Sequence, residues 1–351
     1  MTISKLSSQV GIGLIAALIA ALTLSCTSKE ARLQMNAPLV THIHTADPSA
    51  HAFEGSLYIY PSHDIEGNKA YSGNGDQYDM EDYHVLSMKR PGSEVTDHGE
   101  ALHLKNVPWA SAQMWAPDAA FINGSYILYF PAKDKDGVFR IGAATASSPA
   151  GPFTARDTPI EGSFSMDPAV FADSDGSHYM AFGGLWGGQL EKWQTGTYVS
   201  GASGPRGLAP ALGPRIAKLS ADGLAFAEEP RELVIVDEQG KPLAARDTAR
   251  RFFEGAWIHE HKGLYYLSYS TGDTHLIVYA TSKTLYGPYT YRGKLLDPVK
   301  GWTTHHSIVK FDGKWYFFYH DSSRSGKDHL RDVMYTELRY GKNGEILPVT
   351  R

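Results

Sequence analysis

Residues 254–269 read EGAWIHEHKGLYYLSY, and this stretch carries the pattern that decides the fold. It opens on an acidic residue, continues as a short apolar segment, turns at Gly263 and returns as an aromatic-rich segment. Apolar and aromatic segments of strand length on either side of a glycine turn are typical of a β-hairpin. The stretch therefore predicts two antiparallel strands, with Glu254 at the start of the first.

Four further copies of this hairpin occur along the chain, each opening on Asp or His and turning at a glycine. The copies are 47–60 (DPSAHAFEGSLYIY), 118–130 (DAAFINGSYILYF), 167–182 (DPAVFADSDGSHYMAF) and 305–319 (HHSIVKFDGKWYFFY), with turns at Gly55, Gly124, Gly176 and Gly313. A second pair of strands follows most copies, as in FRIGAATASSPAGPFT at 139–154 and HLIVYATSKTLYGPYT at 275–290. Five four-stranded units predict an all-β, five-bladed β-propeller. A β-sandwich is the alternative, but it gives no reason for whole four-strand units to repeat.

The bulk composition agrees with one large β domain over residues 41–351. The chain has 351 residues, of which 42% are hydrophobic and 12% aromatic, and 35 Gly and 19 Pro supply the many turns. The formal net charge is −5, with both signs interspersed. Since no basic stripe is present, nucleic acid is excluded as an expected partner.

The N-terminus reads as an export signal. Lys5 precedes an apolar run over 10–24 that is too short for a confident membrane span. The run ends in LTLSC, and its Cys26 is the only cysteine of the chain. A bacterial lipobox explains this ending better than an ordinary signal peptide with a chance cysteine. We expect a lipoprotein-type signal peptide at 1–26 and a polar tether at 27–40.

These features predict an exported protein, either an outer membrane-anchored lipoprotein or a periplasmic one. Thr27, rather than Asp, follows the cysteine, which favours the outer membrane. Contact with a membrane is expected only through the lipid anchor.

The residues that open the five hairpins are expected to converge. The innermost strand of each propeller blade lines the central channel, so its first residue lies near one mouth of that channel. These opening residues are Asp47, Asp118, Asp167, Glu254 and His305. Like charges gathered in a cleft repel one another and lose solvation, so such a ring indicates a functional site.

At these residues the chain resembles glycoside hydrolase family 43, the β-xylosidase and α-L-arabinofuranosidase group. The resemblance covers about 41–347, and its motifs are ADPS (46–49), WAPDA (115–119), MDPAVF (166–171), FFEGAW (252–257) and HHS (305–307). It implies an inverting exo-glycoside hydrolase that releases β-D-xylose or α-L-arabinofuranose from plant or algal polysaccharide fragments.

The resemblance also implies residue roles. Asp47 matches the family's general base, Glu254 its general acid, and Asp167 the residue that tunes the pKa of the acid. His305 matches a histidine at the channel centre that lies near a water or a calcium ion. No cofactor is required, and a calcium ion would be structural. Sugar contacts are expected from Trp115, Asp118, Trp186, Trp257 and Arg331.

The chemistry explains these residue types independently. Glycoside hydrolysis needs a carboxylic acid that protonates the leaving oxygen and, for inversion, a carboxylate that activates water. Carboxylates on different blades can face each other across a funnel. A raised pKa is expected for Glu254, from repulsion by Asp167 and from the apolar residues Phe252, Phe253 and Trp257.

Two segments outside the repeat bear on the site. The Gly-rich insertion 183–207 contains Trp186 and Trp193, which either cap the pocket or belong to a loose surface loop. The acidic stretch GNGDQYDMED at 73–82 lacks the register of an EF-hand, which favours a solvated turn over a calcium loop. The H-x-H pairs 42/44 and 259/261 lack an obvious third metal ligand.

Two other functions remain open from the sequence. A retaining, fructosidase-like propeller hydrolase is characterised by NDP, RDP and EC motifs, whereas this chain has ADP, MDP and EG at the matching places. A non-catalytic sugar-binding propeller would be expected to lack one of the acids, and all three are present.

Overall fold

The computed structural model describes residues 35–350, and within them five sheets, antiparallel except for one short parallel pair, form the blades. Blade 1 consists of β1 (His44–Phe53), β2 (Ser56–Asp64), β3 (Asp82–Met88) and β4 (Val95–His103). Blade 2 consists of β6 (Asp118–Ile122), β7 (Ser125–Asp134), β8 (Phe139–Ala146) and β9 (Thr154–Ala155), with β5 (Ala110–Ala112) also paired to β7. Blade 3 consists of β10 (Ala169–Ala172), β11 (His178–Phe182), β12 (Arg215–Lys218) and β13 (Arg231–Glu232).

The remaining elements complete the ring. Blade 4 consists of β15 (Glu254–His261), β16 (Leu264–Ser270), β17 (Ile277–Ser282) and β18 (Tyr289–Leu296), with β14 (Ile235–Val236) parallel to β18. Blade 5 consists of β19 (His306–Phe311), β20 (Lys314–Asp321) and β21 (Asp332–Leu338). Short 3₁₀ helices are η1 (Leu104–Asn106), η2 (Trp186–Gly188) and η3 (Leu190–Trp193).

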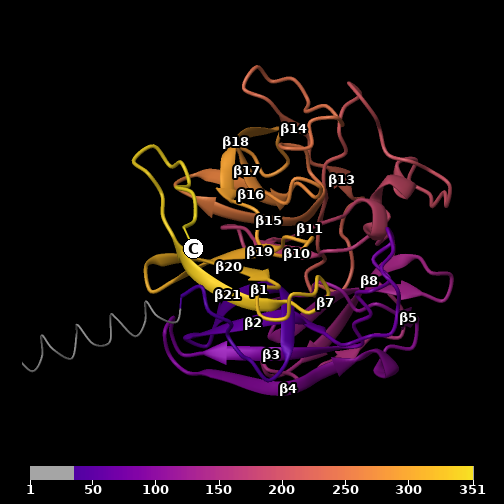
Figure 1. Ribbon diagram of the computed structural model, residues 1–351, viewed down its shortest axis with the longest axis vertical. Coiled ribbons are helices and arrows are strands. Elements are labelled where there is room, and N and C mark those ends of the chain that lie inside the picture. Colours follow the sequence, from indigo (N-terminus) through magenta and orange to yellow (C-terminus); the bar gives the residue numbers. More distant parts are fainter. Residues whose placement is uncertain (1–34, 351) are drawn as a thin grey trace, which may run out of the picture.

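The five innermost strands close a circle, as a propeller requires. β1 contacts β6, β6 contacts β10, β10 contacts β15, β15 contacts β19, and β19 contacts β1 again. Figure 1 shows the meeting point, where the C-terminal strand β21 lies beside β1. The prediction of an all-β, five-bladed β-propeller is therefore confirmed.

The predicted hairpin turns are also confirmed. In the turn between β15 and β16, Lys262 has φ 53° and Gly263 has φ 76°. Positive φ at both central residues defines the type I′ turn, whose twist matches that of the flanking strands. The turn at Asn123 and Gly124 repeats this geometry, with φ 49° and 79°.

The N-terminal segment completes blade 5, which corrects the prediction of a tether over 27–40. The backbone N–H groups of Asn36 and Leu39 donate to the carbonyl oxygens of Tyr335 and Val333 in β21. Leu39 and its neighbours also pack against the core between blades 5 and 1. The edge of β21 offers unpaired backbone groups, and pairing satisfies them. Residues 35–40 of the predicted tether are therefore docked on the edge of the propeller as an irregular segment.

Apolar layers between neighbouring blades form the core. Tyr60 and Tyr83 of blade 1, for example, pack with Leu128 and Phe130 of blade 2. Within residues 35–350, no helix is long and apolar enough to cross a membrane. The predicted signal peptide, 1–26, lies outside the described residues.

Candidate active site

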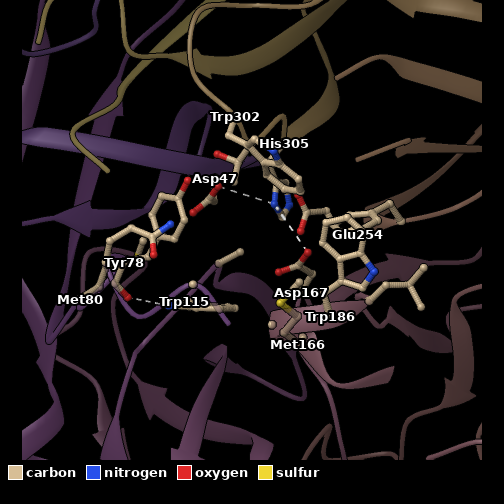
Figure 2. A pocket seen from close by; sticks show the side chains of 18 of the residues that line it. Asp47, Tyr78, Met80, Trp115, Met166, Asp167, Trp186, Glu254, Trp302 and His305 are labelled. Carbon is tan, nitrogen blue, oxygen red and sulfur yellow. Dashed lines mark hydrogen bonds and ion pairs between the residues drawn. The ribbon is translucent and has the colours of Figure 1, made fainter. Parts of the chain in front are cut away.

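A pocket lies at the mouth of the central channel, with contributions from all five blades or their loops. Asp47, Asp167, Glu254 and His305 converge there, as Figure 2 shows. Arg331, which immediately precedes β21, also lines the pocket. The structure thus brings together the predicted base, acid, pKa modulator and central histidine.

Local backbone breaks turn the carboxylates toward the channel. Asp47 has φ 48°, and the register between β1 and β2 shifts just after Ala46. A similar shift follows Glu254 at the start of β15, where Gly255 has φ 64°. Such bulges re-aim a side chain at the end of a strand. Asp167 has φ 56° and precedes β10.

Asp47 is held as an ionised carboxylate. Its Oδ1 accepts a hydrogen bond from Nη1 of Arg331 (2.8 Å) and its Oδ2 accepts one from Ser62 (2.7 Å). Burial alone raises the pKa of Asp47. The positive charge of Arg331, the neighbouring His320 and His305, and the Ser62 hydrogen bond outweigh burial and lower it to about 2.

Arg331 is itself anchored by Asp64, a residue that the sequence did not single out. The Nε and Nη2 atoms of Arg331 donate to the two carboxylate oxygens of Asp64 at 2.8 and 2.7 Å. A bidentate pair of this kind fixes the guanidinium plane. Arg331 therefore holds Asp47 in place as well as lining the pocket.

The environments of Asp167 and Glu254 raise their pKa values, whereas the environment of Asp47 lowers its pKa. Burial and the nearby charge of Asp47 raise the pKa of Asp167 to about 6, although His305 and a 2.9 Å hydrogen bond from the N–H of Gly255 oppose this. Burial, followed by repulsion from Asp167 and Asp47, raises the pKa of Glu254 well above its usual value. Between these two pKa values, Glu254 is therefore protonated while Asp47 is ionised.

His305 lies between two carboxylates without a direct hydrogen bond to either. Its Nδ1 is 3.8 Å from Oδ1 of Asp47 and 3.8 Å from Oδ2 of Asp167. Both separations exceed hydrogen-bonding distance, so His305 acts on these carboxylates through electrostatic interaction rather than through a direct hydrogen bond.

The predicted sugar contacts at Asp118 and Trp257 are wrong. Asp118 is fully buried between blades, where its Oδ2 accepts from the N–H of Val170 (2.5 Å) and its Oδ1 lies 2.5 Å from Nε2 of His51. The register of β6 is regular from its first residue, so no bulge turns Asp118 into the channel. Trp257 is buried between blades 4 and 5, and its indole N–H donates to the carbonyl of Ile308.

The other predicted contacts, Trp115, Trp186 and Arg331, line the pocket. Trp186 is 48% exposed and packs edge-on against Phe253, so it forms part of the rim. Trp193 does not cap the pocket: it is not among the residues that line it, and its buried ring stacks on Phe164. Of the three apolar residues expected around Glu254, only Phe253 lines the pocket.

Two parts of the wall were missed by sequence reasoning. The loop 65–81, between β2 and β3, lines the pocket, and its Tyr78 lies against the guanidinium of Arg331 at 4.9 Å. This corrects the interpretation of 73–82 as a solvated turn. Trp302, just before His305, packs near Trp186 and completes the aromatic rim. The aromatic residues in both segments were the sequence feature that could have indicated their place in the pocket wall.

A propeller with buried, oppositely tuned carboxylates in a pocket rimmed by aromatic rings has the site of a glycoside hydrolase. Residues 40–346 match the family model for glycosyl hydrolases family 43. The chain belongs to that family, whose members invert the anomeric centre, and it is a glycoside hydrolase of the xylosidase and arabinofuranosidase type.

Known xylosidases and arabinosidases are similar to this chain over nearly their full length. Xylosidase/arabinosidase 43A of Humicola insolens is 59% identical over 89% of this chain and 98% of the relative. A xylosidase/arabinosidase of Bacteroides ovatus is 51% identical over 89% and 96%. The crystal structure of CoXyl43, a β-xylosidase/α-arabinofuranosidase from a compost microbial metagenome, superimposes with a TM-score of 0.89 at 60% identity, covering 90% of this chain and 97% of CoXyl43. That structure is described as a complex with xylotriose in a calcium-free form.

Proposed function

We propose that this enzyme removes terminal β-D-xylosyl or α-L-arabinofuranosyl residues from oligosaccharides, with Asp47 as general base and Glu254 as general acid. The observation that carries these roles is the opposite protonation of two carboxyl groups in one pocket. Arg331 keeps Asp47 ionised, whereas burial and repulsion keep Glu254 protonated. The similarity to xylosidase/arabinosidases supports a pentose as the substrate.

The reaction follows from these states. Asp47 accepts a proton from a water molecule, whose oxygen attacks the anomeric carbon on the face opposite the leaving group. Glu254 donates its proton to the glycosidic oxygen as the bond to the anomeric carbon breaks. The product sugar therefore has the inverted configuration.

Asp167 acts on Glu254 without exchanging a proton with the substrate. Its Oδ2 accepts from the N–H of Gly255, the residue that follows the acid, so Asp167 fixes the backbone at that point. Its negative charge also raises the pKa of Glu254. The aromatic rim of Trp186, Phe253 and Trp302 offers faces on which a sugar stacks.

The substrate is tested with nitrophenyl β-D-xyloside, α-L-arabinofuranoside and β-D-galactoside. We expect turnover of one or both pentosides and little of the galactoside. NMR of the first-formed product distinguishes inversion from the retaining, fructosidase-like alternative. Absence of turnover on every pentoside and on xylo-oligosaccharides would contradict the proposal.

We further propose that His305 and water molecules hold a calcium ion beneath the carboxylates. The site offers one imidazole, and the carboxylates of Asp47 and Asp167 already accept hydrogen bonds from protein groups. Calcium retains water ligands readily, so this donor set fits a loosely held ion. The ion would supply positive charge that favours ionised Asp47. The description of CoXyl43 as calcium-free supports a calcium site in similar enzymes.

Removal of calcium is expected to lower both activity and melting temperature. Exhaustive EDTA treatment followed by dialysis provides the stripped enzyme, and added CaCl₂ should restore both quantities together. Magnesium serves as the control, because it demands stricter octahedral geometry. If chelation changes neither quantity, a water molecule bridges these groups and the calcium proposal fails.

Anchoring of the exported protein through Cys26 is likewise a proposal, supported by the LTLSC ending of the apolar run. Cys26→Ser is expected to move the protein from the membrane fraction to the soluble periplasmic or secreted fraction, because bacterial lipoproteins depend on several acyl chains for stable binding. Thr27→Ser is the matched control and should remain in the membrane fraction. Unchanged membrane association of Cys26→Ser would disprove the anchor.

A further inference from the structure

A cluster of histidine and carboxylate groups lies in blade 1, outside the pocket. His63 is near the end of β2, and Asp82 and His84 are at the start of β3. Within residues 35–350, one ligand atom from each of these three side chains lies within 4.8 Å of the other two. Tetrahedral zinc with bonds of about 2.1 Å places its ligand atoms about 3.4 Å apart, so small side-chain movements suffice to complete such a site.

A fourth side chain orients one of these histidines. The Nδ1 atom of His84 lies 2.9 and 3.1 Å from the two carboxylate oxygens of Asp97, while its Nε2 points to Asp82 at 3.6 Å. A carboxylate on Nδ1 favours the tautomer with the proton on Nδ1 and the lone pair on Nε2. This arrangement of carboxylate, histidine and metal recurs at zinc sites.

Charge and exposure also suit a divalent cation. The carboxylates of Asp82 and Asp97 together match a charge of +2. The side chains of His63, Asp82 and His84 are 17%, 12% and 15% exposed. The cluster is therefore reachable from solvent, which can supply a water molecule as the fourth ligand.

We propose that His63, Asp82 and His84 bind a zinc ion, with Asp97 positioning His84. Two imidazoles and one carboxylate suit zinc, whereas calcium prefers six to eight oxygen ligands. The site also has a structural consequence. His63 lies two residues before the loop 65–81, and Asp82 immediately follows it. The ion therefore links the two ends of a loop that forms one wall of the pocket.

Calorimetric titration of EDTA-stripped enzyme with ZnCl₂, in the presence of millimolar CaCl₂, tests the site. We expect one zinc per chain, and a rise in Tm of about 5 °C at a hundredfold excess over Kd. Cobalt(II) should give the intense visible absorption of a tetrahedral centre. His63→Ala and His84→Ala should each weaken zinc binding at least 100-fold, and Asp97→Asn about 10–100-fold.

Two controls assign the binding to this cluster. His98→Ala removes an exposed imidazole from the same blade and should leave zinc affinity unchanged. His305→Ala removes the histidine of the central channel and should also retain zinc binding. His63→Gln provides a second variant if the alanine substitution unfolds the protein, and the Tm without metal reports on folding.

The link to the loop has its own readout. Tyr71 in the loop 65–81 is 64% exposed, which makes it a site for chymotrypsin. Zinc should slow cleavage after Tyr71 in the wild type but not in His84→Ala. The proposal is overturned if no zinc binds at 100 µM. It is also overturned if zinc still binds to both the His63→Ala and the His84→Ala variants. Loss of zinc in His305→Ala alone would place the ion in the channel and equally overturn it.

Discussion

Replacing Asp47 by asparagine is expected to lower kcat/KM by about 10²–10⁴-fold while the fold stays intact. The amide is nearly isosteric and still accepts a hydrogen bond from Arg331, but it cannot take a proton from water. The loss should be the same for nitrophenyl glycosides and for xylo-oligosaccharides, because activation of water does not depend on the leaving group. Steady-state kinetics on both substrates, with the melting temperature as a check on folding, measures it.

Asp118→Asn is the matched control for this substitution. Asp118 is the first residue of the inner strand β6, and Asp47 is near the start of the inner strand β1. The carboxylate of Asp118, however, is buried between blades. The activity of the Asp118→Asn variant per folded molecule should stay within a few-fold of the wild-type activity, although the variant should be less stable. Near-normal turnover by pure Asp47→Asn enzyme would remove Asp47 from the role of base.

Replacing Glu254 by glutamine is expected to lower kcat on xylo-oligosaccharides by about 10²–10⁴-fold, because the leaving sugar alcohol needs a proton. Nitrophenolate leaves without one, so the loss on nitrophenyl glycosides should be much smaller. Equal losses on both substrate types would argue against Glu254 as the acid.

The pH profile gives a second test of Glu254. The pKa of Glu254 is raised, and in the proposed mechanism the protonated form is the active one. Wild-type kcat/KM should therefore be retained below that pKa and fall as the pH rises through it. In Glu254→Gln this alkaline decline should disappear for nitrophenyl substrates, because no proton remains to be lost at this position. Persistence of the same decline would assign it to another group.

The sequence determined much of the framework because its signals are local. Each hairpin needs only a glycine turn flanked by strand-length apolar segments, and these are legible in 254–269 and its four copies. The repeat then places the start of every inner strand near the channel. That argument was sufficient for Asp47, Asp167, Glu254 and His305, all of which line the pocket.

The tertiary structure decided which of the equivalent positions face the channel. Asp118 and Asp47 look alike in sequence, yet a bulge redirects the chain at Asp47, whereas β6 is in regular register from Asp118 onward. A shift of one residue reverses the face on which a strand presents its side chains. The sequence pattern does not reveal such a shift, because it depends on pairing with the neighbouring strand.

Long-range contacts were likewise beyond local patterns. Asp64 anchors Arg331 across 267 residues, and Asn36 pairs with β21 to complete the last blade. The wall formed by the loop 65–81 depends on where the propeller places the ends of β2 and β3. Local residue patterns thus determined the hairpins and the candidate catalytic groups. Ring closure, bulges and packing between distant segments decided the protonation states, the pocket walls and the residues excluded from the site.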